Sequence, residues 1–93
     1  MITSFGDKNT EKLFYGFNST KFPASIKKVA IRKLDMLNAA HLLSDLLAPP
    51  GNKLEKLSGN LRGFYSIRIN EKYRIIFQWE GNNAHQVSTV DYH

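Results

Sequence analysis

The chain has 93 residues, of which 42% are hydrophobic and 23% charged, so it fits a single globular domain over residues 1–93 and not a disordered chain. Thirteen lysine and arginine residues against eight acidic ones give a formal charge of +5, a surplus that favours polyanionic partners such as nucleic acid. Cysteine is absent, which excludes disulfides and thiolate metal sites, and no apolar run suits a signal peptide or a membrane span. We therefore expect a cytoplasmic protein with no membrane partner.

The first half of the chain is predicted to be mainly helical. Ile2–Phe5 is a short apolar opening that we expect to form an edge strand. Asp7 can cap a helix that continues through Phe17. From Ile26 to Ala40 hydrophobic residues recur at helical spacing, with charged residues on the opposite side. Lys33 falls inside this apolar stripe, and we expect its aliphatic stem to be buried while its ammonium group reaches solvent.

The second half of the chain is predicted to form strands. A short helical piece over His41–Leu47 is followed by Pro49-Pro50-Gly51, which we expect to end all helical structure. The hydrophobic period then changes from helical to alternating. This pattern predicts an edge strand and three further strands, over residues 53–57, 65–70, 73–79 and 87–92. Helices followed by hairpin-linked strands indicate an α+β domain, with helices packed on one face of a mainly antiparallel sheet.

The aromatic residues of the strands have two interpretations. Tyr65, Tyr73 and Trp79 alternate with basic residues, and exposed aromatic rings of this kind can stack on nucleic-acid bases. They also occupy the positions that the alternation assigns to the core face of their strands. We favour the core for all three.

Strand register predicts a pair of neighbouring arginines. Ile67 and Ile69 share a face with Tyr73 only if the numbers of paired residues sum to an even value. A tight pairing of that parity places Arg68 opposite, or nearly opposite, Arg74 on the solvent side of the sheet. One interpretation is that the two arginines are exposed strand residues that share no ligand. We favour a shared anion, because guanidinium groups match the geometry of phosphate.

The last three residues of the chain carry side chains that are suited to acid–base catalysis. Asp91, Tyr92 and His93 supply a carboxylate, a phenol and an imidazole, which together cover a general base, a hydrogen-bond donor and a general acid. A solvated tail is the alternative. Joined by Arg74, such an assembly would suit phosphoryl transfer, in which positioning and charge stabilisation supply most of the acceleration.

RNA is the substrate whose cleavage by this assembly would require the fewest additional groups. Its 2′-hydroxyl is a built-in nucleophile, and the histidines of the chain lack metal-ligand spacing, so we expect neither a metal ion nor another cofactor. Further basic residues are predicted to bind RNA: Lys53, Lys56, Arg62, Arg68 and Lys72.

Several motifs together resemble a known family. The run from Pro49 to His93, with PPGNKLEKLSG, SIRIN, YRI and the terminal DYH, is similar to HigB-type toxins of the RelE superfamily, and particularly to GraT-like members. Weaker similarity extends through IRKLDMLNAAHLLSDL to the opening MITSF, so the resemblance covers nearly the whole chain. It implies a RelE-like fold and ribosome-dependent cleavage of mRNA in the decoding site. It also implies neutralisation by a HigA-like helix-turn-helix antitoxin.

The resemblance assigns roles residue by residue. The family's sheet arginine falls on Arg74, and its terminal acidic, tyrosine and histidine residues fall on Asp91, Tyr92 and His93. Some members carry a histidine and a lysine in the loop where this chain has Glu55 and Ser58. A second basic strand position of some members corresponds to Asn70, whereas this chain has Arg68 two residues earlier. These departures leave the general acid unassigned.

The mechanism predicted on this basis uses the 2′-hydroxyl of a message nucleotide. Asp91 or His93 removes or orients its proton, while Arg74, helped by Arg68, stabilises the charge that develops on the phosphate. His93, if it is not the base, protonates the departing 5′ oxygen, and Tyr92 stacks on a base or donates to phosphate. The ribosome would present the message in a reactive geometry.

Two other functions stay open at this point. One is a ParE-like inhibitor of DNA gyrase with the same fold, although such a toxin has no need of Arg74 and the terminal Asp-Tyr-His run. The other is a non-enzymatic RNA-binding module, for which charge and aromatic residues suffice. Mapping message ends after incubation with translating ribosomes separates all three.

Overall fold

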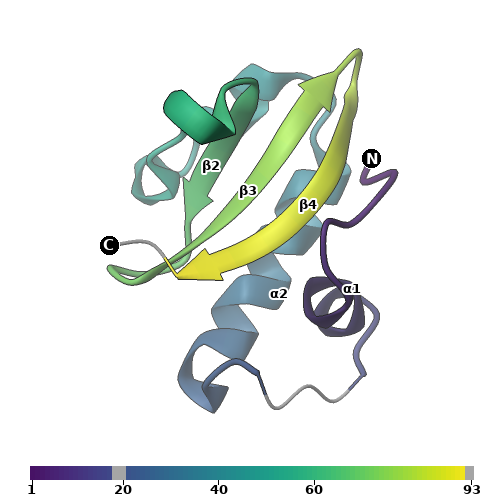
Figure 1. Ribbon diagram of the computed structural model, residues 1–93, viewed down its shortest axis with the longest axis vertical. Helices are drawn as coiled ribbons and strands as arrows, with labels where there is room; N and C mark the ends of the chain where they lie inside the picture. Colours follow the sequence, from purple (N-terminus) through teal and green to yellow (C-terminus); the bar gives the residue numbers. More distant parts are fainter. Residues whose placement is uncertain (18–20, 92–93) are drawn as a thin grey trace.

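The computed structural model describes residues 1–17 and 21–91. Over these residues the two α-helices, α1 (Lys8–Phe14) and α2 (Ala24–Ala39), pack on one face of a four-stranded antiparallel sheet (Figure 1). The strands are β1 (Glu55–Lys56), β2 (Phe64–Arg68), β3 (Tyr73–Glu80) and β4 (Asn83–Asp91), and they are neighbours in that order. The α+β architecture predicted from the change of hydrophobic period is confirmed.

The helix α1 begins where the sequence predicts and ends earlier. The Asp7 carboxylate accepts a hydrogen bond from the backbone N–H of Thr10, as an N-cap does. The prediction that the helix continues through Phe17 is wrong. Gly16 has a φ of +80°, and the N–H groups of Gly16 and Phe17 donate to the carbonyls of Leu13 and Lys12, which closes the helix with a left-handed glycine turn.

The core lies between the helices and the sheet. Its buried residues come from both layers: Leu13, Phe22, Ile26, Ala30, Leu34, Leu37, Ala40, Leu46, Ile67, Ile69, Ile75, Phe77, Ala84 and Val87. Tyr65, Tyr73 and Trp79 are partly buried and pack against this cluster, which confirms the core interpretation of the three aromatic residues. Their rings are therefore not free on the open face of the sheet.

Lys33 departs from the expectation that its ammonium group reaches solvent. The residue is only 6% exposed, and its Nζ donates a hydrogen bond to Oδ1 of Asn52, which is completely buried. Burial lowers the pKa of the Lys33 ammonium below its usual 10.5, and the nearby charge of Arg32 lowers it further. A polar partner within the fold therefore accepts a hydrogen bond from this lysine.

The segment between α2 and the sheet is built from short 3₁₀ turns. The helical piece predicted over residues 41–47 is the turn η1 (Leu43–Leu47). The expectation that Pro49-Pro50-Gly51 ends all helical structure is wrong, because the turns η2 (Pro50–Asn52) and η3 (Gly59–Leu61) follow. Short turns of this kind tolerate proline at their first position, where no backbone donor is needed. They leave the predicted edge strand over residues 53–57 reduced to the two residues of β1.

The opposite edge of the sheet is covered by the N-terminal segment. Ile2 and Phe5 form isolated parallel bridges with Ala84 and Val87 of β4, so the predicted edge strand exists as two contacts and not as a continuous ladder. No helix in the part of the chain that the structure describes is both long and apolar enough to cross a membrane.

A β-bulge interrupts the hairpin of β3 and β4. Gln78 pairs with His85, whereas Ile76 pairs with Ser88, so two residues of β4 oppose the single residue Phe77. Gln86, one of the two, has a φ of +54°, a left-handed conformation that such bulges use. The extra residue reverses which side chains of β4 point to each face beyond this point.

Candidate active site

Arg68 and Arg74 lie directly opposite each other on β2 and β3. Residues opposite each other in an antiparallel ladder project from the same face, so both side chains project from the face that the helices leave open. The register predicted from the sequence is confirmed. A pocket of about 270 Å³ lies on this face, and its walls are Lys53, Glu55, Arg68, Asn70, Glu71 and Arg74.

Arg74 is not on an exposed surface, contrary to the expectation from strand alternation. It is only 7% exposed, because the segment around β1 folds against this part of the sheet. Its Nη2 donates to the carbonyl oxygen of Lys53 at 2.7 Å, and its Nη1 donates to Oε1 of Glu55 at 3.4 Å. The side chain of Glu55 is 49% exposed, whereas that of Arg74 is 8% exposed. The carboxylate of this ion pair is therefore more accessible to solvent than the guanidinium group. Arg74 is thus held in a fixed orientation from two directions.

Asp91 does not join the two arginines. It pairs with Tyr73, while Arg74 pairs with Val90, so Asp91 projects from the helix-bearing face and Arg74 from the open one. The bulge at Gln86 is the physical reason: an uninterrupted ladder continued from the pair of Gln78 and His85 would have put Asp91 on the face of Arg74. Asp91 therefore projects from the face opposite the arginine pair, and its catalytic role stays a prediction.

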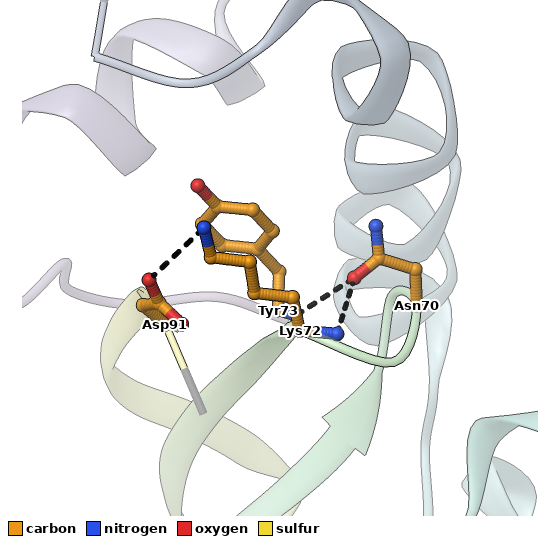
Figure 2. Close-up of polar contacts among 4 residues, drawn as sticks. All are labelled: Asn70, Lys72, Tyr73 and Asp91. Atoms are coloured by element: carbon orange, nitrogen blue, oxygen red, sulfur yellow. Dashed lines mark hydrogen bonds and ion pairs between the residues drawn. The ribbon is translucent and has the colours of Figure 1, made fainter. Parts of the chain in front are cut away.

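The surroundings of Asp91 are shown in Figure 2. Its Oδ2 lies 3.7 Å from Nζ of Lys72, which also lies 5.6 Å from the centre of the Tyr73 ring. The turn before β3 is fixed by Asn70, whose Oδ1 accepts hydrogen bonds from the backbone N–H groups of Lys72 and Tyr73 at 2.9 and 2.7 Å. This end of the hairpin therefore carries an ion pair separate from that of Arg74 and Glu55.

The other predicted RNA-binding residues separate into two groups. Lys53 and Arg68 line the arginine pocket. Lys56 pairs with Tyr65 and so projects from the helix-bearing side, and Arg62 is exposed directly after η3. Tyr92 and His93, which the sequence predicts to be catalytic, lie outside the described residues.

Glu55 is a candidate site residue that the sequence alone does not single out. It pairs with Ser66, which places its carboxylate on the same face as Arg68 and Arg74. Its only distinguishing signal in the sequence is its position in the loop where some HigB-type toxins carry a histidine. A carboxylate beside two guanidinium groups can accept a proton from a hydroxyl while the cations hold an adjacent anion. In the part of the chain that is described, no cluster of acidic or histidine side chains has the arrangement of a metal site.

Comparison with known proteins assigns the family. The model of RelE-like toxins of type II toxin–antitoxin systems, HigB, matches residues 3–93. The chain belongs to the HigB-like toxins. Toxin HigB-1 of Vibrio cholerae serotype O1 is 46% identical over 80 residues, which cover 85% of this chain and 84% of that protein. Endoribonuclease HigB of Proteus vulgaris is 29% identical over 93 residues, with both chains covered completely.

Solved structures support the fold of this HigB-like toxin. The YoeB–YefM complex from Staphylococcus aureus contains a chain that matches it with a TM-score of 0.62 and 23% identity, covering 100% of this chain and 98% of that one. The YoeB dimer from the same organism gives a TM-score of 0.61 and 22% identity, covering 99% and 97%. The RelE-like arrangement of helices and sheet is thus shared at low sequence identity.

Proposed function

We propose that this HigB-like toxin is an endoribonuclease that cleaves messenger RNA on the ribosome. The observation that carries the proposal is the pairing of Arg68 with Arg74 in one pocket that also contains the carboxylate of Glu55. Two guanidinium groups suit the phosphate of an RNA strand, and the carboxylate suits its 2′-hydroxyl. The name of the Proteus vulgaris relative, Endoribonuclease HigB, supports this function.

In the proposed reaction, Arg68 and Arg74 hold the scissile phosphate and stabilise the charge that develops on its oxygens. The Arg74 guanidinium is already oriented by the Lys53 carbonyl, so little reorganisation is needed when the phosphate arrives. The 2′-oxygen attacks the phosphorus, the bond to the 5′ oxygen breaks, and a 2′,3′-cyclic phosphate remains. Positioning and charge stabilisation therefore supply most of the acceleration.

Two proton transfers complete this reaction. Glu55 replaces Asp91 as the proposed acceptor of the 2′-hydroxyl proton, because Glu55 shares the pocket and Asp91 projects from the other face. The departing 5′ oxygen takes its proton from Tyr92 or His93, which stay the candidates given by the sequence. Arg74 contacts Glu55 before RNA binds, so the phosphate must share or replace this contact.

The proposed partners follow from the same site and charge. The ribosome, through its decoding site, would present the message in a reactive geometry, which a small open pocket does not impose by itself. A HigA-like helix-turn-helix antitoxin would neutralise the toxin. A net charge of +5 favours a partner with an acidic surface, since charge complementarity speeds association. Co-expression from the native operon should yield a stable complex, and recovery of free toxin at low salt would contradict this.

The decisive experiment incubates the purified toxin with translating ribosomes and maps the ends of the message. We expect new ends inside codons, and a large loss of them with Arg74→Ala. Intact messages together with loss of gyrase supercoiling would instead identify a ParE-like inhibitor. Intact messages with tight RNA binding would identify a non-enzymatic binding module. Lys28→Ala, which changes an exposed basic residue of α2 that does not line the pocket, is the matched control.

A further inference from the structure

A completely buried asparagine, Asn52, directly precedes Lys53, which lines the arginine pocket. The Nδ2 group of Asn52 donates to the backbone carbonyls of Leu46 and Ala48 at 3.1 and 3.3 Å, and its Oδ1 accepts from Nζ of Lys33. The amide of this one side chain therefore connects the turns η1 and η2 to the middle of α2. Its donors and its acceptor are all used inside the protein.

The lysine that holds this asparagine is costly to bury. Lys33 lies among the apolar residues of α2, and desolvation of its ammonium group lowers its pKa. An apolar residue of similar length would fill the same space without this cost. Packing alone therefore does not account for a lysine here, whereas a need to hold Asn52 does.

The residue after Asn52 has a strained backbone and contacts the proposed catalytic arginine. Lys53 has a φ of +45° and a ψ of +54°, a left-handed conformation that residues other than glycine rarely adopt. In this conformation its carbonyl oxygen accepts the hydrogen bond from Nη2 of Arg74 at 2.7 Å. Strain of this kind persists where the surrounding structure enforces it. The preceding residue, Asn52, is held in place by the hydrogen bonds of its side chain.

We propose that Asn52, held by Lys33, is a positioning residue that fixes the Lys53 carbonyl and thereby orients the Arg74 guanidinium beside Arg68. This inference rests on the function proposed above for Arg74. Asn52 does not line the pocket, so it acts on the phosphate through Arg74 and not by contact. A role limited to holding the loop in the fold would instead lower activity only in proportion to the loss of folded protein.

A double-mutant cycle with Arg74 separates the two roles. We expect Asn52→Ala to lower the cleavage rate on ribosomes about tenfold or more, with little change in the ribosome concentration that half-saturates the reaction. In the Arg74→Ala background the same change should cost less than about twofold, because residues that act as a unit are not additive. Lys33→Met should give part of the loss, since Asn52 keeps its bonds to the two carbonyls.

Leu13→Ala is the control for general destabilisation. Leu13 is a core residue of α1 and does not line the arginine pocket. We expect this variant to lower cleavage only in proportion to its unfolded fraction, and by the same factor with and without Arg74. Equal losses for Asn52→Ala and Leu13→Ala, or losses for Asn52→Ala and Arg74→Ala that multiply, would overturn the inference.

A measurement on the guanidinium group keeps this test independent of cleavage. In ¹⁵N-labelled toxin titrated with inorganic phosphate, the Arg74 side-chain signal should be sharp and shift with phosphate in the wild type and in Leu13→Ala. In Asn52→Ala we expect it to broaden and the phosphate affinity to fall severalfold. If the wild type fails to cleave messages, the proposed function fails, whereas an Arg74 signal unchanged by Asn52→Ala overturns the positioning role alone.

Discussion

At the scale of single residues, the environment of Arg74 combines a functional charge with a structural contact. Its guanidinium group is almost fully buried, and both of its terminal nitrogens donate to the β1 segment. The strand alternation correctly assigns Arg74 to the face without helices, but that face is covered here by a loop from earlier in the chain. Truncation of this side chain therefore affects the fold as well as the chemistry.

Arg74→Ala should lower message cleavage by about a hundredfold or more, because a cation that acts on the developing charge is lost. It should also lower the free energy of unfolding by about 1–3 kcal/mol, since the part-buried hydrogen bond from this charged group to the Lys53 carbonyl is lost. Cleavage and urea unfolding should be measured on the same preparations, with Lys28→Ala, an exposed position of α2, as the control that changes neither. Full cleavage by the folded Arg74→Ala protein would disprove the mechanism.

Glu55→Gln should separate binding from chemistry. The amide cannot accept the 2′-hydroxyl proton effectively, so the rate should fall by about a hundredfold or more. The affinity for RNA should rise, because no carboxylate then competes with phosphate for Arg74. Glu71→Gln is the matched control, since it removes a charge from the same pocket and should raise affinity without lowering the rate. A Glu55→Gln toxin with an unchanged rate would remove Glu55 from the mechanism.

The buried ammonium of Lys33 predicts a dependence of stability on pH. Its pKa is lowered in the folded state, so between that pKa and 10.5 the unfolded chain binds more protons and stability rises with pH. Below the folded-state pKa both states carry the proton, and the full cost of burial is present. The free energy of unfolding of the wild type, relative to Lys33→Met, should therefore increase as the pH rises towards 10.5. A difference that stays constant over this range would show that the lysine is solvated.

At the scale of secondary-structure elements, a chain of hydrogen bonds connects α1 to the sheet. The hydroxyl group of Thr10 donates to Asp7 Oδ2 at 2.9 Å and accepts from the backbone N–H of Thr89 in β4 at 2.8 Å. Thr10 is completely buried. The cap of the helix and the position of the helix on the sheet thus depend on the same side chain.

Thr10→Val should lower the free energy of unfolding by about 1–3 kcal/mol, because the volume is kept while the buried N–H of Thr89 loses its acceptor. Thermal unfolding followed by circular dichroism measures this. Thr3→Val removes a hydroxyl from an exposed residue at the edge of the sheet and should cost clearly less. Equal costs for the two substitutions would show that the buried bond contributes little.

The bulge in β4 shows how one element changes the composition of a site. Ala84 and Val87 are both buried in the core although three positions separate them, which breaks the alternation of a regular strand. That break is a trace of the bulge in the sequence. The bulge places Asp91 opposite Tyr73, on the helix-bearing face and away from Arg74.

At the scale of the whole molecule, the positive charge should make RNA binding depend on salt. Each phosphate neutralised on a single strand contributes about −0.7 to the slope of log affinity against log salt concentration. Arg68→Ala should therefore reduce the magnitude of the slope by about 0.7, whereas Lys28→Ala, on an exposed position of α2, should leave it unchanged. Equal slopes for the wild type and Arg68→Ala would show that Arg68 does not contact phosphate.

The sequence by itself determined the layers of this protein and the identity of its arginine pair. Helical and alternating periods place apolar residues on one face of each element, and the parity of strand pairing fixes Arg68 against Arg74, because both depend only on neighbours in the chain or across one tight turn. The resemblance to HigB-type toxins added the function.

Only the tertiary structure decided what surrounds the arginine pair. The contacts of Arg74 with Glu55 and Lys53 span 19 and 21 residues, and that of Lys33 with Asn52 spans 19, across turns whose path no periodic pattern encodes. The position of Asp91 on the face opposite the pocket depends on the bulge at Gln86, next to the buried Val87. Side chains distant in sequence meet where the backbone bends, and such bends are set by packing of the whole domain, which local preferences do not specify.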